Sequence, residues 1–304
     1  MKYIQFEDKQ HISQLILGCM RMAEKNVQES QVIIQTAFDQ GINFFDHADI
    51  YGAGKSEEIF AQALANTAIS RDQIYLQSKV GIRKGFFDFS KDHILQSVEG
   101  ILKRLNTDYL DSLLLHRPDT LMEPEEVAEA FELLYQSGKV RSFGVSNQHP
   151  GQMQLLQKYI AQPLKFNQLE FGPAHTPMID FGLNVNMKNQ ASMNHDLGIL
   201  EYCRLHDIII QPWSPFQIDL DQGLFMASDQ YQDLVTKLNE LADVHQSTLE
   251  GMVIAWMLRH PAQFQPVIGS MNPERIQRMA QGTEINLSRP EWYEIYRSAG
   301  NILP

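Results

Sequence analysis

Two kinds of residue are scarce in this sequence, and each scarcity excludes a class of protein. Cysteine occurs only as Cys19 and Cys203, so the 304 residues cannot carry a disulfide framework and contain no paired spacing typical of zinc. Lysine and arginine total 25 against 37 aspartates and glutamates, a net charge of −12 with histidine neutral. Because no cluster of basic residues interrupts this acidic chain, we expect it to bind neither nucleic acid nor an anionic membrane.

Long apolar runs are also missing. The longest, near residues 252–258, is far shorter than the roughly 20 residues that a membrane-spanning helix needs. Residues 1–11 mix charged and amide side chains with apolar ones and lack the apolar stretch of a signal peptide. We therefore expect a cytoplasmic protein, in a reducing compartment and without a membrane partner.

What the sequence does contain is a regular alternation of two kinds of segment. Short apolar runs rich in β-branched and aromatic residues are typical of buried strands, and longer stretches with helical spacing separate them. The predicted strands are 15–19, 43–48, 74–80, 110–116, 140–146, 165–171, 208–213 and 265–269. Signals for the start of a helix lie at Ser56, Ser90, Pro124, Asn272 and Ser288.

About eight strand–helix repeats predict a parallel sheet covered by helices. A closed barrel and a doubly wound open sheet both fit this pattern. The open sheet normally has a GxGxxG loop after its first strand, whereas this chain has Leu17-Gly18-Cys19-Met20-Arg21 there. We therefore expect one α/β domain over residues 1–304. It would be a (β/α)8 TIM barrel with long C-terminal-face loops at 172–193 and 217–227 and an extra C-terminal helix.

The carboxyl ends of barrel strands meet at one mouth, where barrel enzymes carry their active sites. Each polar residue there has an ordinary explanation when taken alone, since a lysine is usually solvated and a histidine usually packs in a core. Their shared location favours a functional site. The polar residues at the predicted strand ends are Asp46, His47, Asp49, Tyr51, Lys79, His116, Ser146, Asn147, Gln168, Glu170, Trp213 and Ser214.

Four of these residues make a chemical set. A tyrosine hydroxyl titrates near 10, and a nearby ammonium such as that of Lys79 is expected to lower the pKa of Tyr51 toward the working range. Asp46 would keep the lysine charged, and His116 would orient a carbonyl oxygen. Such a set suits proton delivery to a carbonyl oxygen when a nicotinamide supplies hydride to the carbon.

A metal site is the alternative use of the same strand ends. Asp46, His47, Asp49 and His116 are all possible zinc ligands. Adjacent residues of a strand point to opposite faces, so Asp46 and His47 cannot enter one site, and Lys79 would repel a cation. The sequence therefore predicts no metal.

Six ordered segments resemble those of the aldo-keto reductase family and together cover nearly the whole chain. They are Asp46–Gly52 (D-x-A-x-x-Y-G), Leu115-His116, Gly144–Asn147 (G-x-S-N), Asn167–Glu170 (N-Q-x-E), Trp213-Ser214-Pro215, and Ile268–Ser270 with Asn272–Ile276. Among branches of the family, the chain is most similar to bacterial oxidoreductases of the YdhF type.

The resemblance implies an NADP-dependent enzyme that reduces aldehydes or ketones to alcohols, with Asp46, Tyr51, Lys79 and His116 as its catalytic residues and Tyr51 as the proton donor. Ser146, Asn147 and Gln168 would hold the nicotinamide carboxamide, and Trp213 would stack on the ring. The Ser214, Pro215 and Phe216 segment would cover the pyrophosphate. The adenosine end would contact Gly269, Ser270, Asn272, Arg275 and Arg278. Arginine suits a 2′-phosphate, so NADPH is expected to be preferred over NADH.

The sequence departs from the family pattern at two places. Bulky Phe216, Gln217 and Ile218 stand where the family often has glycine, so the covering loop is expected to contact pyrophosphate differently. Gly269 replaces a frequent lysine, and Arg278 would compensate for that lost cation.

Two properties stay open. The chain could instead be a cofactor-binding regulatory or auxiliary subunit with little turnover, although all four catalytic positions are intact. Its substrate is expected to be a small carbonyl compound, in a pocket with walls from Met20, Phe86, Phe87 and residues 172–193. We expect a monomer or weak oligomer.

Overall fold

The computed structural model describes residues 1–6, 10–219 and 221–303. Eight parallel strands pair in the order β11-β10-β9-β8-β5-β4-β3-β12. Their bounds are β3 (Ile16–Gly18), β4 (Phe44–Asp46), β5 (Tyr75–Val80), β8 (Leu110–Leu115), β9 (Val140–Ser146), β10 (Leu164–Glu170), β11 (Ile209–Trp213) and β12 (Val267–Ile268). The Gln265 amide next to β12 donates to Ile210 O of β11 at 3.0 Å, which brings the sheet's two edges together. The predicted TIM barrel is confirmed.

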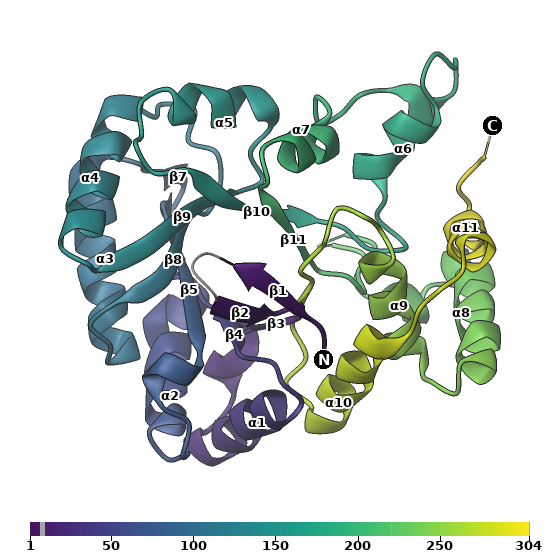
Figure 1. Ribbon diagram of the computed structural model, residues 1–304, viewed down its shortest axis with the longest axis horizontal. Helices are drawn as coiled ribbons and strands as arrows, with labels where there is room; N and C mark the ends of the chain where they lie inside the picture. Colours follow the sequence, from purple (N-terminus) through teal and green to yellow (C-terminus); the bar gives the residue numbers. More distant parts are fainter. Residues whose placement is uncertain (7–9, 220, 304) are drawn as a thin grey trace.

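Helices surround the sheet (Figure 1). They are α1 (Val27–Asp39), α2 (Lys55–Leu64), α3 (Lys91–Leu105), α4 (Pro124–Gln136), α5 (Pro150–Gln157), α6 (Pro177–Leu183), α7 (Ile199–Leu205), α8 (Gln232–Val244), α9 (Leu249–Leu258), α10 (Pro273–Gln281) and α11 (Arg289–Ser298). The predicted start signals hold at α3, α4, α10 and α11, where Ser90, Asn272 and Ser288 cap the helix and Pro124 opens it. The extra C-terminal helix is α11. No helix of the described residues is long and apolar enough to cross a membrane.

The start of α2 differs from the prediction. The helix begins at Lys55 after Gly54, whose φ of 91° is left-handed and suits glycine. Ser56 is inside the first turn and buried, and its hydroxyl donates to Cys19 O at 2.5 Å. Ser56 therefore ties the helix to the end of β3 rather than capping it.

An N-terminal hairpin, which the strand pattern did not predict, closes one end of the barrel. Strands β1 (Tyr3–Phe6) and β2 (Gln10–Ser13) pair in antiparallel fashion (Figure 1). Phe6 enters the barrel at its N-terminal end, with its ring stacked 5.1 Å from Phe166 and edge-on at 5.8 Å from Tyr75. Burial of these aromatic rings fixes the hairpin over the barrel bottom.

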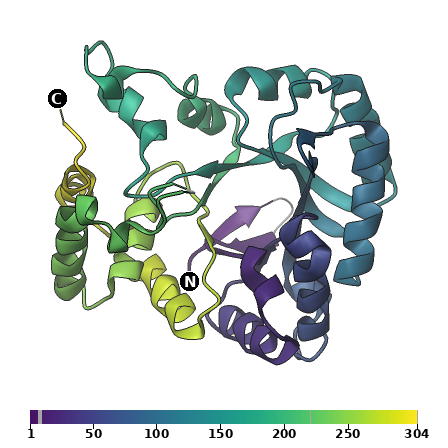
Figure 2. The same cartoon turned by 180° about the vertical axis from the view of Figure 1, so that it is seen from behind.

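The C-terminal-face loops are more structured than expected. Residues 172–193, predicted as a loop, include helix α6, which proline opens at Pro177. A short antiparallel pair, β6 (Ile82–Arg83) and β7 (Phe86–Phe87), follows β5. The other predicted loop, 217–227, carries only a bridge between Gln217 and Leu224 and a short 3₁₀ turn among its described residues. Seen from behind, the barrel has the hairpin on its far side (Figure 2).

Candidate active site

Lys79, near the C-terminal end of β5, is the centre of the site. Its side chain is fully buried. Its Nζ donates to Asp46 Oδ2 at 2.6 Å, to His47 O at 2.9 Å and to Tyr51 OH at 3.2 Å. Three of the four predicted catalytic residues are therefore in direct contact around one ammonium.

The charges of this cluster decide which protons are present. Burial alone lowers the pKa of Lys79, but Asp46 and Tyr51 outweigh it, so the pKa lies above its usual value and the lysine is charged. Burial raises the pKa of Tyr51 by more than Lys79 lowers it. The expected net lowering is therefore wrong: desolvation dominates, and Tyr51 is protonated at neutral pH.

His116 lies beside Tyr51 with the two rings edge-on, their centroids 5.9 Å apart. Burial, with the charges of Lys79 and Arg117, brings the pKa of His116 well below its usual value. Its buried Nδ1 has no hydrogen-bond partner in the described part of the chain. A neutral imidazole of this kind can donate one hydrogen bond to a carbonyl oxygen.

The turn after Tyr51 holds its hydroxyl in place. Gly52, Ala53 and Gly54 have φ values of 58°, 55° and 91°, three left-handed residues in succession. A Cβ on Gly52 would lie 2.4 Å from Ala23 Cβ, so only glycine fits there. The tyrosine thus leaves the strand end on a tightly packed turn.

A layer of amide side chains inside the barrel supports Asp46 from below. Asp46 Oδ1 accepts from Gln77 Nε2 at 2.7 Å and from Gln168 Nε2 at 3.2 Å, which leaves Oδ2 for Lys79. Gln77 and Gln168 both also donate to Gln211 Oε1, and Gln211 donates to Gln265. The sequence prediction missed Gln77, Gln211 and Gln265, although glutamine inside an apolar strand was a visible signal.

Three residues predicted to hold a nicotinamide lie together at the ends of β9 and β11. Asn147 Nδ2 donates to Ser146 Oγ at 2.7 Å, and Trp213 Nε1 donates to Asn147 Oδ1 at 3.3 Å. Gln168 is close by, since Ser146 Oγ donates to its backbone oxygen, but its side-chain NH₂ faces Asp46 and Gln211.

The predicted covering loop is anchored by its bulky residues. Ser214 begins it with a left-handed φ of 52°. Pro215 packs so closely on Gly172 that a Cβ there would lie 2.4 Å from Pro215 O. Phe216 and Ile218 are buried in the main hydrophobic cluster, so bulk here fixes the loop to the barrel.

The predicted adenosine end lies at the start of α10. Asn272 Oδ1 caps the helix by accepting from the Arg275 amide at 3.1 Å, and Ser270 Oγ accepts from the Asn272 amide at 3.3 Å. The Arg275 guanidinium forms no ion pair with a described residue, and a Cβ added to Gly269 would meet nothing within 4 Å.

Two arginines near α10 differ from the sequence prediction. Arg278 lies 3.6 Å from Glu250 and 3.9 Å from Glu274, so its charge is already partly neutralised. Arg21 Nη1, from the loop after β3, lies 3.5 Å from Gly269 O. Its contribution was missed because 248 residues separate it from Gly269 in the chain.

Two of the four alternative metal ligands, His47 and Asp49, have their neighbours outside this site. His47 packs edge-on against Phe60 of α2, and burial lowers its pKa to about 3. Asp49 faces Glu57 and Arg104 of the surrounding helices. Within residues 1–6, 10–219 and 221–303, no group of three or more histidine, cysteine, aspartate or glutamate side chains could hold a metal ion.

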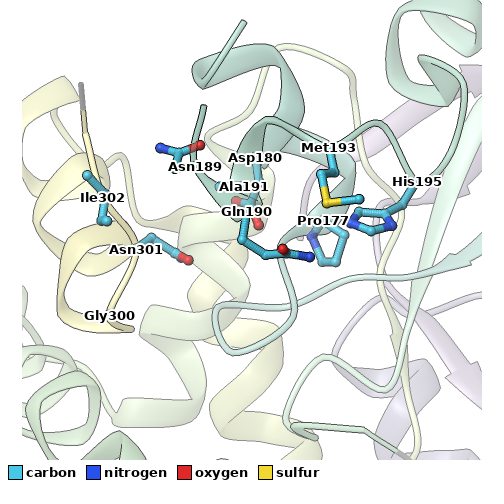
Figure 3. Close-up of a pocket in the computed structure, with 10 residues that line it drawn as sticks. All are labelled: Pro177, Asp180, Asn189, Gln190, Ala191, Met193, His195, Gly300, Asn301 and Ile302. Atoms are coloured by element: carbon cyan, nitrogen blue, oxygen red, sulfur yellow. The ribbon is translucent and has the colours of Figure 1, made fainter. Parts of the chain in front are cut away.

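Part of the 172–193 segment lines a separate pocket of about 320 Å³ against the C-terminal tail (Figure 3). Figure 3 shows Asn301 and Ile302 on one side and Met193 and His195 on the other, with Gln190 between them. Met20, Phe86 and Phe87 are not among its lining residues. Those three side chains are exposed, Met20 at the start of a 3₁₀ turn after β3 and Phe86 and Phe87 in β7.

Comparisons with known proteins agree with this geometry. Residues 14–299 match the model of the aldo/keto reductase family. The chain is 35% identical over 298 residues to oxidoreductase YdhF of Escherichia coli (strain K12), covering 94% of this chain and 93% of the relative. It is 32% identical over 312 residues to 6-dehydroglucose reductase of Agrobacterium fabrum, covering 98% of each chain.

A solved structure extends the likeness to the whole fold. The aldo-keto reductase from Klebsiella pneumoniae, in complex with NADPH, superposes with a TM-score of 0.77 and 26% identity, over all of this chain and 96% of the other. The family match, the sequence relatives and the barrel geometry together lead to one conclusion: this chain belongs to the aldo/keto reductase family.

Proposed function

We propose that this protein reduces aldehydes or ketones with NADPH and that Tyr51 donates the proton. One observation carries the proposal: a buried ammonium, that of Lys79, contacts both the Asp46 carboxylate and the Tyr51 hydroxyl. A relative of 26% identity that was solved in complex with NADPH supports the cofactor assignment.

The residues present fit a nicotinamide dinucleotide. Bound there, the cofactor supplies hydride to the carbonyl carbon. Ser146, Asn147 and Gln168 would hold the carboxamide and Trp213 would stack on the ring. At the other end, Arg275 and Arg21 offer positive charge beside Ser270 and the open face of Gly269, which suits phosphate oxygens. Arg278 would add less, because Glu250 and Glu274 share its charge.

Side chains of this protein then donate the proton and stabilise the charge that it leaves behind. Tyr51 is protonated and can donate to the carbonyl oxygen as negative charge develops on it. The Lys79 ammonium stabilises the phenolate that remains, and Asp46 with its two amide donors keeps that ammonium charged. Neutral His116 would orient the same oxygen with an N–H.

The proposal includes the cellular location and the oligomeric state of the enzyme. We place it in the cytoplasm, which the two buried free cysteines support, and we expect a monomer or weak oligomer. Light scattering on the purified chain with and without NADPH tests the oligomeric state.

The Tyr51→Phe variant tests the proton donor. We expect it to bind NADPH as tightly as the natural chain while losing nearly all turnover on a panel of aldehydes and ketones, because only the donated proton is removed. NADPH consumption and fluorescence titration measure the two quantities. Near-normal rates in this variant would contradict the role of Tyr51. NADPH binding by the natural chain with no turnover on any carbonyl would favour the auxiliary-subunit alternative.

A further inference from the structure

Arg117 reaches across the mouth of the barrel. It follows His116 at the end of β8, yet its guanidinium carbon lies 5.5 Å from the centre of the Trp213 ring at the end of β11. Strands β9 and β10 separate these two strands in the sheet (Figure 1). The half-buried side chain therefore lies over the strand ends between His116 and Trp213, where a substrate would approach Tyr51.

The guanidinium has no polar partner among residues 1–6, 10–219 and 221–303. By contrast, Arg83 on the same face is neutralised by Asp88 at 2.7 Å. Arg117 has only the face of Trp213, which leaves five N–H donors without an acceptor. The guanidinium nitrogens are not buried, so an acceptor on a ligand at the mouth can reach them.

The charges that face Arg117 leave the mouth short of anions. Lys79 is balanced by Asp46, and His116 is neutral. Glu170 and Asp219 are the other acids nearby, but the Glu170 carboxyl forms no ion pair with Arg117; its partner is His175 Nε2 at 4.0 Å. Burial raises the pKa of Glu170, although the positive charges of His175 and Arg117 oppose this shift.

We propose that Arg117 determines substrate specificity by binding a carboxylate on the carbonyl compound. A guanidinium pairs with a carboxylate through two parallel N–H donors, which would fix the substrate's orientation beside His116. The proposed substrates are therefore aldehydes or ketones that carry a carboxylate. This inference rests on the proposed reduction at Tyr51.

Matched pairs of aldehydes test the proposal: 4-carboxybenzaldehyde against 4-methylbenzaldehyde, and succinic semialdehyde against butanal. The readout is the ratio of kcat/KM for the acid over that for its neutral match, with NADPH. We expect Arg117→Met to lower this ratio at least about tenfold, as loss of a charged hydrogen bond should, and Arg117→Lys to restore part of it. Arg83→Met, which also removes one positive charge from this face, should leave the ratio unchanged.

A binding measurement separates this inference from the proposed function. Benzoate titrated into the protein loaded with NADP needs no turnover, and its Kd should rise at least about tenfold in Arg117→Met. If no carbonyl compound is turned over but the benzoate Kd still rises in Arg117→Met, only the reductase proposal is contradicted. An unchanged ratio and an unchanged benzoate Kd would overturn the role of Arg117. So would an equal effect of Arg83→Met, or a loss confined to NADPH affinity.

Discussion

The two ends of the barrel differ in chemistry although the same strands build both. Along β5 the inward side chains pass from Tyr75 through Gln77 to Lys79, and along β10 they pass from Phe166 through Gln168 to Glu170. The N-terminal end is aromatic and closed by the hairpin, the middle is a hydrogen-bonded amide layer, and the C-terminal end is charged.

Within a single strand, one end therefore stabilises the fold and the other end carries the chemistry. At the closed end, apolar rings stack and bury surface, which stabilises the fold without any ionisable group. At the open end, Lys79 and Asp46 are held out of water at a cost that only their pairing offsets. The amide layer joins the two ends, because Gln265 Nε2 donates to Ser13 O at the end of the hairpin.

The largest expected effect comes from breaking the pair at the open end. Asp46→Asn would leave the buried Lys79 ammonium without its carboxylate, so we expect a loss of about 3–5 kcal/mol in the free energy of unfolding together with loss of turnover. Denaturant unfolding and NADPH consumption measure the two effects.

The double variant Asp46→Asn with Lys79→Met is the control for that comparison. Removing both charges should recover most of the stability but none of the activity. A double variant no more stable than Asp46→Asn alone would show that the charge pair is not what holds this end together.

A smaller effect, on stability alone, is expected at the closed end. Phe6→Ala removes a buried ring from the N-terminal hairpin that closes the barrel, and it should cost about 3 kcal/mol in the free energy of unfolding. Because Phe6 lies at the opposite end of the barrel from Tyr51 and Lys79, kcat/KM of the folded variant should stay within about twofold of the natural value, that is, within about 0.4 kcal/mol. A large fall in kcat/KM would break the proposed separation between the two ends.

Local patterns predicted much of this molecule. The eight barrel strands were visible because buried parallel strands are continuous apolar runs, and Asp46, Tyr51, Lys79 and His116 were visible as polar residues at strand ends. The hairpin was missed because its strands are short and mix polar with apolar residues, and their burial depends on the distant Phe166.

What the sequence could not predict depends on tertiary distance and desolvation. Arg117 contacts Trp213 and Arg21 contacts Gly269, and both contacts join segments far apart in the chain. The sign of the pKa shift at Tyr51 was wrong because the sequence shows that a lysine is near but not how much water the fold removes.

The pH dependence of the hydride-transfer step in both directions tests the central claim most directly. Burial raises the pKa of Tyr51, so the hydroxyl is protonated up to about pH 10, where free tyrosine titrates. Single-turnover reduction of an aldehyde should therefore be independent of pH between about 6 and 9, whereas oxidation of the matching alcohol should rise about tenfold per unit, because it needs the phenolate. Tyr51→Phe should abolish both. A reduction rate that falls with a midpoint near pH 7 would contradict the raised pKa of Tyr51, and turnover that survives in Tyr51→Phe would contradict its role as the proton donor.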